Sequence, residues 1–273
     1  MKQYEDLDFS DDFMFSKLLY DDKEKCREIL HRILGEEIPT IFYSDYQETI
    51  NNGYNAKGVR LDILAKDING NTHDIEMQVE IQKDIPKRCR YYHSMIDMDQ
   101  LKKGEYYNEL KPTYVIFICK NGIKPGMDKA IYKYEYRTLK DNLTLGDGSY
   151  TILVNATSTD EDNSTELASL LRYIRNGEID ESDEFIQRLH NSVLEARNRE
   201  NWRSEYMTHE MREIELKMIG REEGREEGRE VGREEGIKEC ITKLIGKGMV
   251  PSEVSKMLDI KLENVLKIIS QKC

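Results

Sequence analysis

The stretch GVRLDILAKDINGNTHDIEMQVEIQ, residues 58–82, decides the fold that we expect for this chain. It holds two segments in which polar and apolar residues alternate, one on each side of Asn69-Gly70. Alternation of this kind is typical of β-strands, and Asn-Gly between two such segments is a strong signal for a hairpin. We therefore predict two antiparallel strands, over residues 58–67 and 73–82.

Each predicted strand has a polar face and an apolar face. The polar members are Arg60, Asp62 and Lys66 in the first strand and Asp74, Glu76, Gln78, Glu80 and Gln82 in the second. Pairing Asp62 with Glu76 centres the hairpin on residue 69, whereas a plain two-residue turn would set Asp62 against Met77 and mix the faces. We therefore predict a three- or five-residue connection, or a bulge.

The carboxylates of Asp62 and Glu76 are candidates for a metal site. Two such groups repel by about 4 kcal/mol at about 4 Å in a partly buried setting, and a cation removes that repulsion. Their oxygen atoms suit Mg²⁺ or Mn²⁺, and such an ion can lower the pKa of bound water and stabilise charge on a phosphate. On spacing alone, a solvent-exposed hairpin with ordinary polar residues is the simpler interpretation.

The segments on either side of the hairpin complete an α/β pattern. Residues 12–34 have the apolar spacing of helices, and a further helix is expected over residues 86–103, ended by Gly104. TYVIFIC, residues 113–119, is a continuous apolar run that is typical of a strand buried on both faces. Residues 131–155 contain further strand-like stretches. This order of elements predicts an α/β domain.

From about Ser164 onward the sequence is typical of helices and leads into the low-complexity repeat REEGREEGREVGREEG, residues 221–236. Each glycine there costs a helix about 1 kcal/mol relative to alanine, and each Glu–Arg pair returns only about 0.2–0.5 kcal/mol. The repeat is therefore unfavourable as an isolated helix. Two interpretations stay open: a self-associating helical stalk, in which the glycines let a second helix approach closely, and a solvated flexible linker.

The last segment, residues 237–273, predicts three small helices around a miniature core. Its apolar residues fall into groups with helical spacing, namely Ile241, Leu244 and Ile245, then Val254, Met257 and Leu258, then Leu262, Val265, Leu266 and Ile269. Short turns separate these groups, as in a helix-turn-helix module whose last helix enters the major groove of DNA. Lys261 and Lys267 would then contact DNA; a plain interaction domain is the alternative.

Composition limits the class of protein. The net charge of −12 counts against binding that relies on phosphate neutralisation alone, although lysines outnumber acidic residues in residues 237–273. The five cysteines form no C-x-x-C pair and the five histidines lack ligand spacing, so neither a zinc site nor a disulfide framework is expected. With no apolar run of membrane length and an acidic opening segment, we expect a cytoplasmic protein without a membrane span.

Several blocks of the sequence resemble a known family. They are KGVRLDILAKD (57–67), HDIEMQVEIQ (73–82), KRCRYYHSMID (87–97), LKKGEYYNELKP (101–112) and YVIFI (114–118), with the opening DDFMFSKLL and the REEG repeat. In this order they are similar to the family of recombination-promoting nucleases and transposase-like proteins, a branch of the PD-(D/E)XK nuclease superfamily. The resemblance covers nearly the whole chain.

The resemblance implies the restriction-endonuclease-like α/β fold, a mixed sheet flanked by helices, here followed by a helical C-terminal region. It also implies cleavage of DNA that depends on a divalent metal, Mg²⁺ or Mn²⁺. Asp62 matches the aspartate of the family motif, Glu76 the second metal ligand, and Gln78 the position where many superfamily members have lysine. Glutamine is usual in this family.

Glutamine at this position can hydrogen-bond but carries no charge. We therefore expect Lys66, Arg88 or Arg90 to supply the positive charge, and Asp12 to complete the metal shell.

Four tyrosines lie in the segments that follow the hairpin, and Tyr92 and Tyr107 are the candidates to contact DNA. Aromatic rings can stack on unpaired bases. The alternative for these two, as for their neighbours Tyr91 and Tyr106, is ordinary half-buried packing.

The chain is thus predicted to hold four regions: a nuclease-like domain over 1–160, a helical extension over 161–219, a charged glycine-repeat helix or linker over 220–236, and a three-helix module over 237–273. The predicted function is that of a metal-dependent DNA endonuclease that acts in recombination or element mobility and forms a homo-oligomer through its helical C-terminal region. A catalytically silent DNA-binding or assembly protein with the same fold is the alternative.

Overall fold

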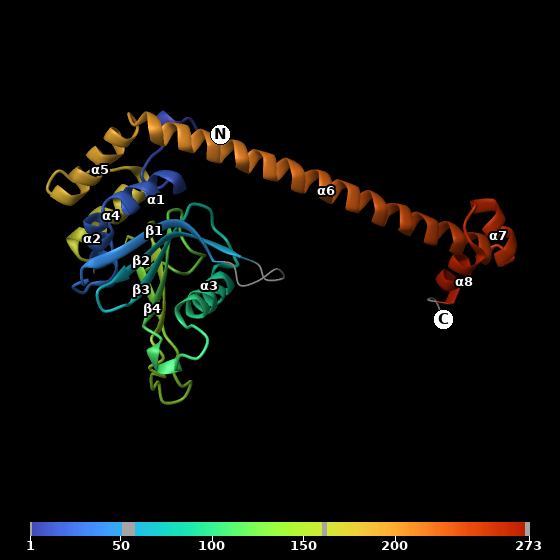
Figure 1. Cartoon of the computed structure of the whole chain (residues 1–273), viewed down its shortest axis with the longest axis horizontal. Coiled ribbons are helices and arrows are strands. Elements are labelled where there is room, and N and C mark those ends of the chain that lie inside the picture. The colour runs from blue at the N-terminus through green and yellow to red at the C-terminus, as the bar shows by residue number, and fades with distance from the viewer. Residues whose placement is uncertain (1, 51–57, 160–162, 271–273) are drawn as a thin grey trace. The chain divides into compact units, whose positions relative to one another are not determined.

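The computed structural model describes residues 2–50, 58–159 and 163–270, which form two compact units, Met1–Tyr206 and Met207–Cys273. In the first unit, helices lie on both faces of a central sheet, with α3 on one side and α1, α2, α4 and α5 on the other (Figure 1). The predicted fold class, a mixed sheet flanked by helices, is confirmed.

The sheet has six strands in the order β1-β2-β3-β4-β6-β5. Their bounds are β1 Ile41–Ile50, β2 Val59–Asp67, β3 Thr72–Gln78, β4 Thr113–Cys119, β5 Ile131–Tyr134 and β6 Ser149–Asn155. The central strands β3, β4 and β6 are parallel, whereas β1, β2 and β5 run antiparallel to their neighbours. The central β4 is the apolar run that the sequence predicted, with its bounds unchanged, and almost all of its side chains are buried.

The hairpin of β2 and β3 has the odd-numbered connection that its polar faces require. Lys66 pairs with Thr72, the register in which Asp62 and Glu76 lie opposite each other. The backbone N–H of Asp67 donates to the carbonyl oxygen of Asn71 at 3.1 Å, which leaves a three-residue loop. Within that loop Gly70 has a φ of +85°, a conformation that glycine adopts without strain.

One face of the sheet is covered by four helices and a short 3₁₀ turn. Their bounds are η1 Tyr4–Asp6, α1 Asp12–Asp21, α2 Lys23–Leu34, α4 Thr165–Asn176 and α5 Glu184–Ala196. Apolar side chains of β2, β3, β4 and β6 pack there against Phe15, Leu30, Leu170 and Ile186. The sequence predicted one or two opening helices within residues 12–34, and the structure has two.

The other face is covered by α3, Ile85–Gln100. Its residues Ile85, Cys89 and Ile96 form a second core with Val115 and Phe117 of β4. This helix lies over the face that carries the polar residues of β3, so every residue of β3 is buried. Carboxylates that a lone hairpin would expose to water are here enclosed between a sheet and a helix.

Four sequence-based expectations were wrong in detail. The edge strand β1 was not predicted, because its residues, IFYSDYQETI, lack a regular alternation. The second hairpin strand ends at Gln78, and Val79 and Ile81 beyond it are 39% and 56% exposed. Helix α3 ends at Gln100, so Gly104 lies in the following turn. The residues Val59, Leu61, Ile63 and Ala65 of β2, expected on one apolar face, belong to two different cores. Val59 and Leu61 join the core beneath α3, and Ile63 and Ala65 join the core on the opposite face.

The second unit is helical. It contains most of α6, Glu200–Gly246, which is a continuous helix through the glycine repeat, then α7, Pro251–Leu258, and α8, Leu262–Ser270. The three-helix core predicted for residues 237–273 is present and centres on Ile241, Val254 and Val265. Three of the predicted core residues, Met257, Leu262 and Leu266, are instead exposed. No helix in the described part of the chain is long and apolar enough to span a membrane.

Candidate functional site

The site lies where β2 and β3 separate. Backbone pairing between the two strands runs from the hairpin loop as far as Ile63 and Ile75. Farther from the loop, carboxylate side chains accept the hydrogen bonds of the backbone N–H groups. The backbone N–H of Asp62 donates to Oε1 of Glu76 at 2.9 Å, and the backbone N–H of Met77 donates to Oδ2 of Asp62 at 2.9 Å. Each carboxylate therefore bridges the gap between the two strands, which fixes both side chains with backbone hydrogen bonds.

These carboxyl groups are shielded from water and repel one another. Burial raises the pKa of Asp62 well above its usual value, and the charges of Glu76 and Asp12 raise it further. Burial and the charge of Asp74 likewise raise the pKa of Glu76, which is 3% exposed, while the Asp62 N–H and Arg88 oppose that shift. A concentration of negative charge in a buried place favours binding of a cation.

Arg88 reaches this site from α3. Its Nη2 donates to Oε2 of Glu76 at 3.0 Å, and its Nη1 donates to Oε1 of Gln78 at 2.8 Å. The guanidinium carbon lies 4.8 Å from the centre of the Phe117 ring and 5.4 Å from that of Tyr92, whose hydroxyl accepts from Nη2 at 2.9 Å. Packing against two rings holds the guanidinium in one position beside the carboxylates.

Gln78 is oriented at both ends of its amide. Its Oε1 accepts from Arg88, and its Nε2 donates to the carbonyl oxygen of Glu80 at 2.9 Å. A lysine at position 78 would carry a positive charge, and here Arg88, which hydrogen-bonds Gln78, carries that charge instead. The sequence indicated Arg88 as a source of charge but gave no way to choose it over Lys66 or Arg90, because that choice depends on where α3 packs.

Asp74 belongs to the same cluster and was not selected as a site residue from the sequence. It is fully buried, and within the described residues neither carboxyl oxygen has a hydrogen-bond partner. Burial, and then the charge of Asp62, raise the pKa of Asp74 well above its usual value. The signal was present in the strand alternation, which places Asp74 on the face of Glu76 and Gln78.

The other candidates near the hairpin lie at different distances from the carboxylates. Asp12, the first residue of α1, is exposed and close enough to Asp62 for their side chains to hydrogen-bond. Lys66 is four residues from Asp62 along β2, about 13 Å at the usual rise of a strand, beside the hairpin loop. Arg90 is exposed on α3 and lines a cavity on the far flank of that helix.

The candidates for DNA contact do not converge. Tyr92 is 8% exposed and packs beneath Arg88, whereas Tyr107, in the short 3₁₀ turn η2 (Tyr107–Glu109), is 85% exposed. Lys261 and Lys267 are exposed and belong to the second unit. The structure thus brings together Asp12, Asp62, Glu76, Gln78, Arg88 and Tyr92.

The donor set suits a hard divalent cation held by few protein ligands. Among the described residues, no three His, Cys, Asp or Glu side chains are placed to hold one ion together. Mg²⁺, however, is usually bound by one or two carboxylates, with water and phosphate oxygens in the remaining positions. The partly buried Asp62 and the buried Glu76 supply two mutually repelling carboxylates, which fits that mode of binding.

A mixed sheet with acidic residues at the separation of two antiparallel strands defines an α/β protein of the nuclease-like class. The profile of the PD-(D/E)XK nuclease family transposases matches residues 9–221. The chain therefore belongs to this family, as the resemblance implied. Neither the search of curated proteins nor the search of solved structures found a match.

Proposed function

We propose that this protein is a divalent-metal-dependent DNA endonuclease that hydrolyses phosphodiester bonds in recombination or element mobility. The observation that carries the proposal is the pair of carboxylates formed by the partly buried Asp62 and the buried Glu76, held between β2 and β3 by backbone hydrogen bonds. Membership of a transposase family of nucleases makes DNA the expected substrate.

In this proposal each residue of the site has its own role. Asp62 and Glu76 bind Mg²⁺ or Mn²⁺, and Asp12 contributes an outer ligand or a hydrogen bond to its water. When bound, the ion lowers the pKa of a water molecule and neutralises charge on the phosphate. Gln78 hydrogen-bonds the attacking water or a phosphate oxygen, and Arg88 fixes Gln78 while adding positive charge.

The test is plasmid cleavage by the full chain with Mg²⁺, Mn²⁺ or EDTA. The proposal expects nicking or linearisation with either metal, none with EDTA, and a loss of at least about 100-fold in Asp62→Asn and Glu76→Gln, because each variant removes a charged metal ligand. Asp141→Asn is the matched control, since Asp141 is an exposed carboxylate outside the site.

A folded protein that binds DNA but cuts no plasmid under any of these conditions would favour the alternative, a silent binding or assembly protein. One observation favours that alternative. Arg88 already neutralises Oε2 of Glu76, so the site is partly charge-compensated without a metal. Isothermal titration with Mn²⁺ separates the two functions independently of cleavage, because only the nuclease needs the Asp62 and Glu76 ligands.

Two further parts of the proposal concern the second unit. We propose that α7 and α8 add DNA affinity as a helix-turn-helix-like module through Lys261 and Lys267, which are both exposed. The αL conformation of Asp259, at a φ of 51°, supports the tight turn that such a module needs between its helices. We also propose that the chain self-associates through α6.

A further inference from the structure

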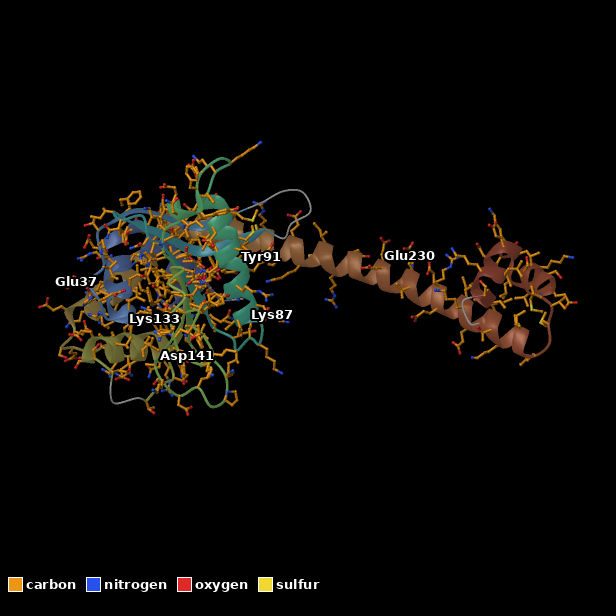
Figure 2. All side chains as sticks on the ribbon, turned by 90° about the horizontal axis from the view of Figure 1, so that it is seen from below. Glu37, Lys87, Tyr91, Lys133, Asp141 and Glu230 are labelled. Carbon is orange, nitrogen blue, oxygen red and sulfur yellow. The ribbon has the colours of Figure 1, made fainter. Side chains whose placement is uncertain are left out.

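A second concave site lies on the opposite flank of α3 from the carboxylates. It is a cavity of about 850 Å³, near the upper end of the usual range for ligand sites. One wall is the flank of α3 with Cys89, Arg90, His93 and Ser94, and the other wall comes from β6 and the segment after β5. Figure 2 shows Lys87 and Tyr91 on the outer side of α3, away from the sheet, so neither side chain fills this space.

One residue near the N-terminus of α3 is shared between the surroundings of the cavity and those of the site. Gln82 lines the cavity, and its Oε1 accepts from Nη1 of Arg88 at 3.3 Å. The site and the cavity are therefore separated by one helix, whose diameter with side chains is about 10–12 Å. At about 3.4 Å per nucleotide, three or four nucleotides of a DNA strand span that distance.

The walls of the cavity match the chemistry of a nucleotide. Apolar surface from Ile85, Cys89 and Leu153 forms the floor of the cavity. Two exposed tyrosines, Tyr134 and Tyr136, lie at its edge. Base faces stack on aromatic rings of this kind. Four cations also line the cavity, Lys83, Arg90, Lys111 and Lys124, together with three acidic residues, Asp97, Glu135 and Asp147, so the lining has a small excess of positive charge.

One polar group in the wall has no partner among the described residues. His93 is 9% exposed, its Nε2 lies 3.1 Å from Oγ1 of Thr151, and its Nδ1 is unpaired. Burial lowers the pKa of His93 to about 4, so the ring is neutral and offers either a donor or an acceptor. The Nδ1 atom is shielded from solvent, so His93 contributes a neutral part of the wall and no charge.

We propose that this cavity binds an unpaired nucleotide of the DNA strand whose phosphate lies at the carboxylates. The base stacks at the tyrosine edge, while the cations hold the backbone. The enzyme would then select DNA that is locally unpaired close to the cut. This inference rests on the proposed function and specifies its substrate.

The test compares the affinity of the full chain for three fluorescein-labelled DNAs: a paired duplex, the same duplex with a four-nucleotide single-stranded gap, and the single strand. Anisotropy is read in EDTA, where no cleavage is expected. The inference expects about tenfold tighter binding of the gapped duplex than of the paired one, an effect at the lower end of that for stacking one base.

The decisive variant is Ser94→Trp. Ser94 is exposed on α3 and lines the cavity, so tryptophan fills the space without disturbing a core. In this variant the affinities for gapped and for paired duplex should differ by less than about twofold. The melting temperature of the variant should equal that of the unmodified protein. Met98→Trp is the matched control, because Met98 is 61% exposed on the same helix and does not line the cavity.

A direct readout of position comes from 5-iodouracil placed in the gap. Photo-crosslinks mapped by mass spectrometry should fall on Tyr134 or Tyr136 in the unmodified chain and disappear in Ser94→Trp. Equal affinity for paired and gapped DNA, or a preference that Ser94→Trp retains, would overturn the inference. If plasmid is still cut in a metal-dependent way, only the cavity assignment fails, whereas absence of both DNA binding and cleavage removes the proposed function with it.

Discussion

Arg88 and Gln78 together occupy the role that one lysine has in many proteins of the superfamily. The guanidinium lies 2.8 Å from the amide oxygen of Gln78, so a second cation at position 78 would be repelled by it. Gln78→Lys alone should therefore lower cleavage, and Arg88→Gln alone should lower it by about 10- to 100-fold, the loss of one charged hydrogen bond.

The double variant Gln78→Lys/Arg88→Gln restores one cation and should cleave faster than either single variant. Initial rates of plasmid nicking under saturating Mg²⁺ measure this. Lys87→Gln is the control, since Lys87 is exposed on the same helix and does not line the cavity. Losses that simply add in the double variant would show that Arg88 does not act through position 78.

Asp74 is a buried carboxyl group without a partner among the described residues, and it gives the protein a pH dependence. The pKa of Asp74 is higher in the folded protein than in the unfolded chain, so the neutral carboxyl group favours folding. This contribution to stability is complete below the unfolded pKa and is lost as the pH rises toward the folded pKa. In EDTA the free energy of unfolding should therefore fall as the pH rises above the unfolded pKa, near about 4.

Asp74→Asn removes the charge while keeping the shape, and at pH 8 it should stabilise the metal-free protein by about 1–3 kcal/mol. Urea unfolding at pH 5 and pH 8 checks both values, and the gain should be smaller at pH 5. A variant that is destabilised equally at both pH values would contradict this account of Asp74.

The sequence could predict which residues of the hairpin meet, but not what surrounds them. Strand alternation and the odd-numbered connection suffice to bring Asp62 and Glu76 together. The contacts of Arg88 and the burial of Asp74 depend on α3 lying over that face, which is a tertiary contact without a local signature. Residues whose roles come from neighbours distant in sequence were therefore missed.

At the level of elements, strong local signals gave correct assignments. The apolar run of β4 and the two opening helices have patterns that only one structure satisfies. The edge strand β1 depends on pairing with β2, and Val79–Gln82 lost strand structure although its alternation continues. Pairing partners, and not composition, decide where such strands begin and end.

Asp183, which precedes helix α5, connects this helix to α2. Its carboxylate caps α5 by accepting from the N–H groups of Phe185 and Ile186, and it pairs with the buried Arg32 at 2.6 Å. Burial acts to raise the pKa of Asp183, but the hydrogen bonds from Arg32 and from the Ile186 N–H outweigh it and lower the pKa to about 2.

Asp183→Ala should destabilise the first unit by about 1.5–3 kcal/mol, because the buried Arg32 loses one of its two carboxylate partners and keeps only Glu28 and a carbonyl oxygen. Since the folded pKa is lowered, the stabilisation is present above the unfolded pKa near 4 and is lost as pH falls toward 2. Denaturant unfolding at pH 7 and pH 3 measures this, with the exposed Asp141→Ala as control. A destabilisation below about 1 kcal/mol at pH 7 would show that the cap and the ion pair are dispensable.

At the scale of the whole molecule, the chain joins a folded α/β unit to a helical unit with unusual exposure of apolar residues. On α6, Met207, Met211, Ile214 and Met218 are 50%, 68%, 42% and 66% exposed. Their spacing of four, three and four residues is the heptad pattern of a two-helix seam. The glycine repeat that follows is helical although its glycines disfavour a lone helix, and a Cβ atom added at Gly224 or Gly228 would meet nothing within 4 Å.

A second copy of the chain that packs its own α6 along this stripe would bury the four side chains, each contributing about 1.5–3 kcal/mol if fully buried. We therefore expect sedimentation equilibrium of the full chain to give a mass above 32.1 kDa that rises with concentration. Met211→Lys/Ile214→Lys should yield a monomer with an unchanged first unit, as read from metal-dependent cleavage. Ile219→Lys is the control, because Ile219 is 48% exposed but lies about 100° around the helix from Met218. A single 32.1 kDa species at every concentration would remove the stalk and leave α6 as a solvated connection between the two units.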